Sequence, residues 1–174
     1  MNRTLISFIT LLLAAPFLTG CGGPARPEGM PRLYPASIEV KQEGTPLEGA
    51  TVTLVAESAE LGRWVPSGIT DTAGVVVLQT NGLHKGAPLG NFKVVIEKRV
   101  TEPHPHPEWA GADRGTPEEA KYDQLDRARK MHNYVEPQYS SMTDTPLKID
   151  IVANQKVYPV DAGKKIQTAE ARAQ

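Results

Sequence analysis

Apolar and polar residues alternate in several short segments between residues 36 and 152, and this period of two restricts the fold more than any other feature. Ile38 and Val40 alternate with Glu39 and Lys41, and the same pattern recurs over 50–56, 91–98 and 147–152. Successive side chains of a β-strand point to opposite faces, so each segment is predicted to be a strand with one buried face.

Two further strands are expected between these segments. Residues 64–70 contain Pro66, which cannot donate a ladder hydrogen bond and therefore favours an edge or a bulge. The run Val75 to Thr80 is almost continuously apolar, which is typical of a strand covered on both sides. Asp71 and Gly74 predict a tight turn between these two strands, and Gly44 and Pro46 predict another turn earlier in the chain. Many short strands with closely spaced turns, and no alternation of strand and helix, predict an antiparallel β-sandwich.

An insertion at about 99–146 separates the last two of these strands, and it contains the clearest helix signal. Thr116 suits the N-cap, Pro117 the first helical position, and Glu119 completes a capping box. Asp123 with Arg127, and Asp126 with Lys130, have the spacing of stabilising pairs on a helix. The apolar stripe of this segment is thin, which predicts a surface helix lying on the sheet.

The first 20 residues have the composition of a bacterial secretory signal. Arg3 precedes a short apolar run, Leu5 to Phe17, which has fewer than the roughly 20 residues that span a bilayer. The stretch Leu18 to Cys21 (LTGC) resembles the lipobox of bacterial lipoproteins, in which the cysteine is acylated and the chain is cut before it. The alternative is a simple secretion signal with a chance cysteine, but Cys21 is the only cysteine of the chain.

The sequence therefore predicts four parts. They are a lipoprotein signal peptide (1–20), a flexible Gly/Pro-rich tether (21–33), a β-sandwich with its helical insertion (34–160) and a mobile tail (161–174). The lipid on Cys21 would attach the chain to a membrane of the cell envelope, and Gly22 suggests the outer membrane. The formal net charge is −1 and no basic run is present, so no nucleic-acid partner is expected.

Three segments resemble the motifs of carboxypeptidase regulatory-like domains, and together they extend over about residues 38–98. They are Gly44 to Leu54 (GTPLEGATVTL), Ser67 to Gly74 (SGITDTAG) and Gly86 to Val94 (GAPLGNFKV). The layout is similar to that of small planctomycete-type lipoproteins of this family, with Val135 to Tyr139 and Thr145 to Ile151 in the places of two later family segments. The resemblance implies a transthyretin-like Greek-key sandwich of about seven strands, similar to the immunoglobulin fold.

The motif residues of this family are structural, and the resemblance brings no catalytic residue with it. It implies that six residues build turns: Gly44, Pro46, Gly49, Asp71, Gly74 and Gly90. No G-x-S-x-G, H-E-x-x-H or phosphate-loop pattern occurs either. The sequence thus predicts a protein that is not an enzyme and needs no cofactor.

His104 and His106 are the best metal candidates, and they are weak ones. Side chains two residues apart on an extended chain point to opposite sides, so a solvated, proline-stiffened loop is the favoured interpretation. His84 or His132 would have to contribute from elsewhere. An aromatic platform for sugars or peptides from Trp64, Trp109 and Tyr122 is also less favoured than ordinary packing.

Two classes of function remain open. The first is a membrane-tethered structural or protein-interaction module of the cell envelope with an envelope protein as partner. The second is a protein that binds a small ligand, a glycan or a metal, through the 99–146 insertion. Long connections inside a compact domain are commonly functional, so the insertion is expected to carry the specificity in either class.

Overall fold

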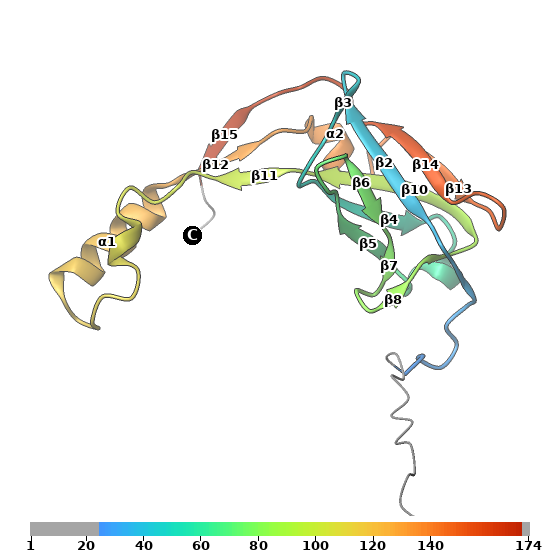
Figure 1. Ribbon diagram of the computed structural model, residues 1–174, viewed down its shortest axis with the longest axis horizontal. Coiled ribbons are helices and arrows are strands. Elements are labelled where there is room, and N and C mark those ends of the chain that lie inside the picture. Colours follow the sequence, from blue (N-terminus) through green and yellow to red (C-terminus); the bar gives the residue numbers. More distant parts are fainter. Residues whose placement is uncertain (1–24, 172–174) are drawn as a thin grey trace, which may run out of the picture.

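The computed structural model describes residues 25–171 (Figure 1). The expected signal peptide (1–20), Cys21 and residues 22–24 and 172–174 lie outside the described residues. Strands dominate, in agreement with the predicted all-β sandwich, and the helices are short. Within residues 25–171 no helix has the length and apolar character needed to cross a bilayer.

The larger sheet has six strands, and all of its neighbouring strands pair antiparallel. In spatial order they are β13 (Lys148–Ile151), β10 (Gly90–Glu97), β4 (Thr51–Ala56), β5 (Pro66–Ile69), β7 (Gln79–Thr80) and β8 (His84–Lys85). The alternation that predicted strands at 50–56, 91–98 and 147–152 is matched by β4, β10 and β13.

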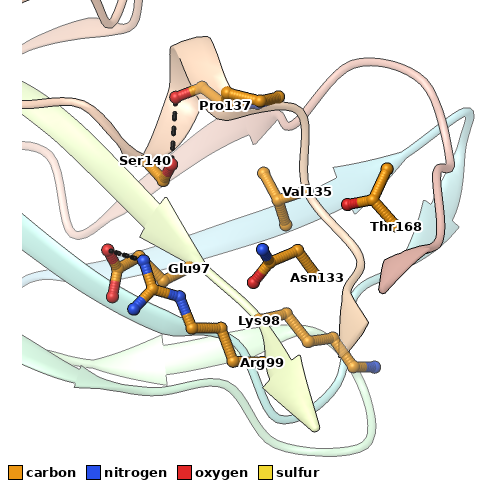
Figure 2. A pocket seen from close by; sticks show the side chains of 8 residues that line it. All are labelled: Glu97, Lys98, Arg99, Asn133, Val135, Pro137, Ser140 and Thr168. Atoms are coloured by element: carbon orange, nitrogen blue, oxygen red, sulfur yellow. Dashed lines mark hydrogen bonds and ion pairs between the residues drawn. The ribbon is translucent and has the colours of Figure 1, made fainter. Parts of the chain in front are cut away.

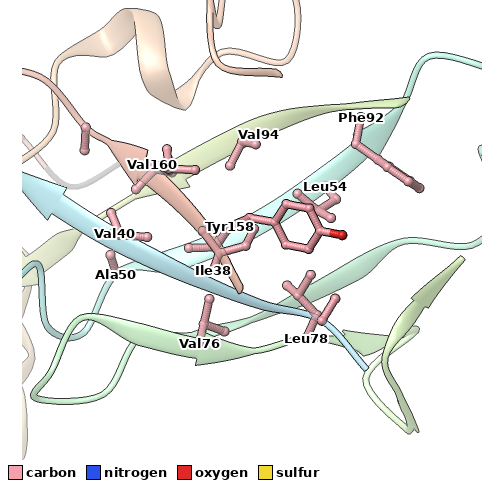
Figure 3. Packing of buried hydrophobic residues seen from close by; sticks show 14 of the residues in the cluster. Ile38, Val40, Ala50, Leu54, Val76, Leu78, Phe92, Val94, Tyr158 and Val160 are labelled. Carbon is pink, nitrogen blue, oxygen red and sulfur yellow. The ribbon is translucent and has the colours of Figure 1, made fainter. Parts of the chain in front are cut away.

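The second sheet is built around β2 (Ser37–Gln42). On one side β2 pairs in parallel with β14 (Val157–Asp161), and on the other it pairs antiparallel with β3 (Thr45–Pro46) and β6 (Val75–Val77). A short additional pair, β1 (Leu33–Tyr34) with β9 (Ala87–Pro88), closes one end of the sandwich. The two sheets enclose one core (Figure 3), whose largest fully buried aliphatic and aromatic members are Phe92, Ile38, Leu54, Leu78, Ile96 and Ile151.

The run Val75 to Thr80 differs from the expected strand with two covered faces. It changes sheets at Leu78, with β6 pairing to β2 and β7 pairing to β5. Burial alternates along it, because Val76 and Leu78 are in the core whereas Val77 is 61% exposed. The apolar run therefore marks a strand that crosses from one sheet to the other.

Residues 99–134 leave the sandwich as an arm, seen at the left of Figure 1. The arm contains β11 (Arg99–Thr101), the 3-10 turn η2 (Pro107–Trp109), α1 (Pro117–Ala128) and β12 (Lys130–Asn133). The helix was expected to lie on the sheet, but it projects away from it and has no buried residue. The rest of the insertion returns to the sandwich through α2 (Pro137–Ser140), next to β10.

Both ends of the domain differ from the sequence-based boundaries. The expected mobile tail contains β15 (Thr168–Ala171), which pairs with β12 and makes the arm sheet three-stranded. The expected flexible tether is packed on the sandwich over its last part, since Met30 is buried and Leu33 and Tyr34 belong to β1. The 3-10 turn η1 (Ala59–Leu61) lies at that same end.

Candidate interaction arm

The arm is the least buried part of the molecule. From Arg99 to Tyr134, all of which the structure describes, not one residue is buried. Its sheet has the order β11-β12-β15, with Val100 opposite His132 and Arg99 opposite Asn133. A segment of this length without a core of its own presents its side chains to solvent or to a partner.

Helix α1 forms because its N-terminus is capped locally. The Thr116 hydroxyl accepts a hydrogen bond of 3.2 Å from the Glu119 amide, and Pro117 occupies the first turn. The Glu119 carboxylate accepts from the amide of Gly115, one residue before the N-cap, which is a variant of the expected capping box.

The charged pairs of the helix differ in part from the expectation. Arg127 lies 3.9 Å from Asp123, at the expected spacing. Asp126 is paired with Arg129, because the helix ends at Ala128 and Lys130 already belongs to β12.

Four rings form two stacked pairs near the tip of the arm. His104 stacks on Tyr122 with 3.9 Å between ring centroids, and His106 stacks on Trp109 at 4.1 Å. The Lys121 ammonium lies 5.3 Å from the Trp109 ring. These contacts join the proline-broken loop to α1, so the rings form a small surface cluster that stiffens the tip.

Two of the three aromatic candidates lie in the arm, and the third does not. Trp109 and Tyr122 belong to the ring cluster, whereas Trp64 is 4% exposed in the sandwich with Arg63 over its ring. The three residues are not brought together as one platform. Trp109 and Tyr122 each have one face occupied by a histidine, which leaves less ring surface for a sugar to stack on.

Both ring nitrogens of His104 have partners, one in the loop and one in α1. Nδ1 accepts a hydrogen bond of 2.9 Å from the His106 amide, and Nε2 lies 3.2 Å from the Tyr122 carbonyl. His106 Nδ1 lies 3.0 Å from the Glu108 carboxylate. The pKa of Glu108 is lowered by the hydrogen bond from its own backbone amide and then by the bond to His106.

The other two histidines lie elsewhere, His84 in β8 of the sandwich and His132 in β12. Among residues 25–171 no three His, Cys, Asp or Glu side chains are grouped as a metal site would require. The structure therefore does not assemble the expected histidine candidates around one ion.

A charged cluster holds the hairpin of the arm together. Glu102 Oε1 lies 2.9 Å from His132 Nε2, and Oε2 accepts from the Lys130 amide at 3.1 Å. Arg129 donates to the Glu102 carbonyl at 2.6 Å. The bond to His132, followed by the bond from Lys130, lowers the pKa of the Glu102 carboxyl.

A small cavity lies at the root of the arm, between the arm sheet and α2 (Figure 2). It is lined by Glu97, Lys98, Arg99, Asn133, Val135, Pro137, Ser140 and Thr168. Its volume of about 70 Å³ is well below the roughly 300 Å³ at which ordinary ligand pockets begin. A few water molecules would fill it, and a sugar would not fit.

The turn residues all lie on the sandwich. Asp71 Oδ1 accepts hydrogen bonds of 2.9 Å from the amides of both Ala73 and Val75. Gly74 follows at φ +74°, where an added Cβ would lie 2.6 Å from the Val40 carbonyl oxygen. Positive φ is also found at Gly44, Gly49 and Gly90, and Pro46 lies in β3. The motif residues therefore serve to form turns of the backbone.

Sequence reasoning missed the residues that fasten the arm and the rest of the 99–146 insertion to the sandwich. Gln42 is 5% exposed and its amide donates to the Tyr134 and Lys164 carbonyls, both at 2.9 Å. Thr145, 3% exposed, donates to the Val94 carbonyl at 2.7 Å. Gln42 was a weak signal in the sequence, as the polar residue at the next inward position after Ile38 and Val40.

The chain matches no family model, no curated protein and no solved structure.

Proposed function

We propose that this protein is a lipid-anchored, non-catalytic lipoprotein of the bacterial cell envelope whose arm binds an envelope protein. The observation that carries the proposal is the arm itself, residues 99–134, which projects from the sandwich with no buried residue. Ordering a segment costs conformational free energy, which burial usually repays. Here the exposed surface is available for burial against a partner.

A protein partner suits the arm better than a small ligand does. Its sheet and helix present charged side chains of both signs together with the partly exposed rings of His104, His106, Trp109 and Tyr122. Aromatic side chains and arginine are common in protein interfaces. The root cavity is too small for a sugar. Both ring nitrogens of His104 and Nδ1 of His106 have partners within the arm.

The proposed sandwich family supports a role as a module without catalysis. The motif residues of the suggested carboxypeptidase regulatory-like domain serve turns here, as Asp71 and Gly74 illustrate. Their polar atoms are occupied by main-chain contacts. A fold does not by itself confer a function, so specificity must come from what is attached to the sandwich, which is the arm.

The proposed lipid anchor rests on Cys21, the only cysteine of the chain, at the lipobox position. When cells are grown with a labelled fatty acid, the label should be incorporated into the parent protein and not into Cys21→Ser. The variant should also remain uncleaved or be released from membranes. A Cys21→Ser protein that still fractionates with membranes at the mass of the parent would overturn the anchor.

Partner binding by the arm is tested with photo-crosslinking residues in cells that produce the protein. We expect a defined adduct from Gln124, which is exposed on α1. Val77, which is 61% exposed on the sandwich, is the matched control and should give no such adduct. Adducts from Val77 but not from Gln124 would assign binding to the sandwich and overturn the proposal.

A further inference from the structure

Three exposed apolar side chains gather at the end of the sandwich where the N-terminal segment docks. Val65 is 37% exposed, Leu83 65% and Leu89 40%. We infer that this end, called here the proximal surface (segments 25–34, 57–65 and 81–89), lies against the lipid headgroups of the membrane. The inference rests on the proposed lipid anchor at Cys21 and adds an orientation and a second membrane contact to it.

The first observation is how early the chain is fastened to the sandwich. Arg63 donates a hydrogen bond of 3.2 Å to the carbonyl of Glu28. Met30 is 8% exposed, and β1 begins at Leu33. A Cβ on Gly86 would lie 2.4 Å from the Tyr34 carbonyl oxygen, so the segment is closely packed there. The domain is therefore held from Glu28 onward.

The second observation is the short length of chain between the lipid-bearing residue and this point. Seven residue steps separate Cys21 from Glu28, and a fully extended chain of that length spans at most about 25 Å. The eight residues of β10 have a similar length, about 27 Å. The sandwich thus cannot move from the membrane by more than about its own length.

The third observation is that three of the nine exposed large apolar side chains among the described residues lie at this end. The Val65 amide donates to Asn81 Oδ1, and the Val65 carbonyl accepts from the Asn81 amide, which places Val65 beside the turn that carries Leu83. Leu89 follows β9, the partner strand of β1. In Figure 1, β8 and the N-terminal segment lie at one end of the sandwich and β3 lies at the other.

Charge on the proximal surface neither drives nor prevents this contact. Its cationic side chains are Arg26, Arg32, Arg63 and Lys85. Its carboxylates are Glu28, Glu57 and Glu60, of which Glu57 is paired with Lys148 at 2.6 Å. Four cations against three carboxylates give little net attraction for anionic lipid, so the contact depends on apolar side chains. A short tether gives such a weak contact a high effective concentration.

The test places a polarity-sensitive fluorophore on the lipid-modified full chain. Leu83→Cys labels the proximal surface, and Thr45→Cys, exposed on β3, labels the opposite end as the matched control. Because acylation occupies the Cys21 thiol, each introduced cysteine is the only free thiol. The proteins are reconstituted into phosphatidylcholine vesicles containing lipids with a headgroup-level quencher, with or without phosphatidylglycerol.

We expect the label at 83 to lose most of its emission and the label at 45 to keep it, with little change when phosphatidylglycerol is added. Equal emission from both labels on protein that floats with the vesicles would overturn the membrane contact and leave the lipid anchor intact. Protein that fails to float with the vesicles would overturn the anchor, and the inference that rests on it.

Discussion

The side-chain amide of Gln42, in the middle of the molecule, donates a hydrogen bond of 2.9 Å to the carbonyl of Tyr134 at the root of the arm. The same amide donates to the Lys164 carbonyl at 2.9 Å. Gly163 beside it is packed on Tyr139, because an added Cβ would lie 2.5 Å from that ring. One buried side chain of β2 thus joins the sandwich, the arm and the C-terminal segment.

We predict that Gln42→Leu weakens this junction. The half-buried hydrogen bonds to the Tyr134 and Lys164 carbonyls are lost, and each bond of this kind is worth about 0.5–1.5 kcal/mol. Chemical denaturation should show that loss, and hydrogen exchange should show faster exchange in β12. Gln124→Leu on the exposed face of α1 is the control. Identical denaturation of Gln42→Leu and the parent would contradict the assigned role.

The core tolerates no charge at the centre of β10. Val94 is 0% exposed and pairs with Leu54 of β4. Val94→Asp would bury an unpaired carboxylate at a cost of several kcal/mol, which is comparable to the stability of a small domain. We expect no cooperative thermal transition in this variant. Val77→Asp places the same group on a 61% exposed valine and should melt like the parent.

The sandwich could be predicted from the sequence where burial alone sets the pattern. Ile38, Val40, Val52 and Leu54 alternate with polar residues, and all four are fully buried. The strand β14 carried the same signal, since Tyr158 and Val160 are buried and their neighbours are exposed. The segment is short and contains Pro159, which cannot donate a ladder hydrogen bond, so its pattern is a weaker strand signal.

The arm sheet could not be predicted because two of its strands, β11 and β12, have no buried face. Val100 is 45% exposed, and neighbouring residues of β11 and β12 are exposed or half-buried without a clear period. The strand at Thr168–Ala171 is defined by main-chain pairing with β12. Every residue except proline has the same main-chain donor and acceptor, so a hydropathy pattern does not show which main-chain groups pair.

Acid should loosen the hairpin of the arm. The pKa of Glu102 is lowered from 4.5 in the folded protein by His132 and the Lys130 amide, so its carboxylate stabilises the hairpin above pH 4.5. That stabilisation is lost as the pH falls through the lowered value, below 4.5. Hydrogen exchange of β11 and β12, corrected for the intrinsic pH dependence, should show lower protection at pH 3 than at pH 6. Glu102→Gln should remove most of this difference.

Loss of protection on acidification to the same extent in Glu102→Gln would contradict this assignment. Arg129 and Lys130 face the same cluster, through bonds to the Glu102 carbonyl and carboxylate. The comparison of parent and Glu102→Gln therefore isolates the contribution of the Glu102 carboxylate, which contacts both His132 and the Lys130 amide.

Removal of the outer arm should leave the sandwich folded, whereas removal of the whole insertion should not. The Glu102 amide donates to the Lys130 carbonyl at 3.0 Å, so residues 103–129 can be replaced by a two-residue Asn-Gly hairpin turn. Nothing buried is lost, and the free energy of unfolding should stay within about 1 kcal/mol of the parent. Replacing 99–146 also removes Val135 and Thr145, which are 4% and 3% exposed.

Thermal melts of the two deletion variants show whether the outer arm stabilises the sandwich or serves only to bind a partner. The 103–129 variant should show a cooperative transition near that of the parent. When the crosslinking residue is placed in its new turn, it should not form the adduct that Gln124 gives in the parent. The 99–146 variant should lack a cooperative transition, because the Thr145 hydroxyl bond to Val94 and the Val135 side chain are gone. A 103–129 variant without a cooperative transition would show that the outer arm stabilises the domain, and would contradict its assignment as a free binding surface.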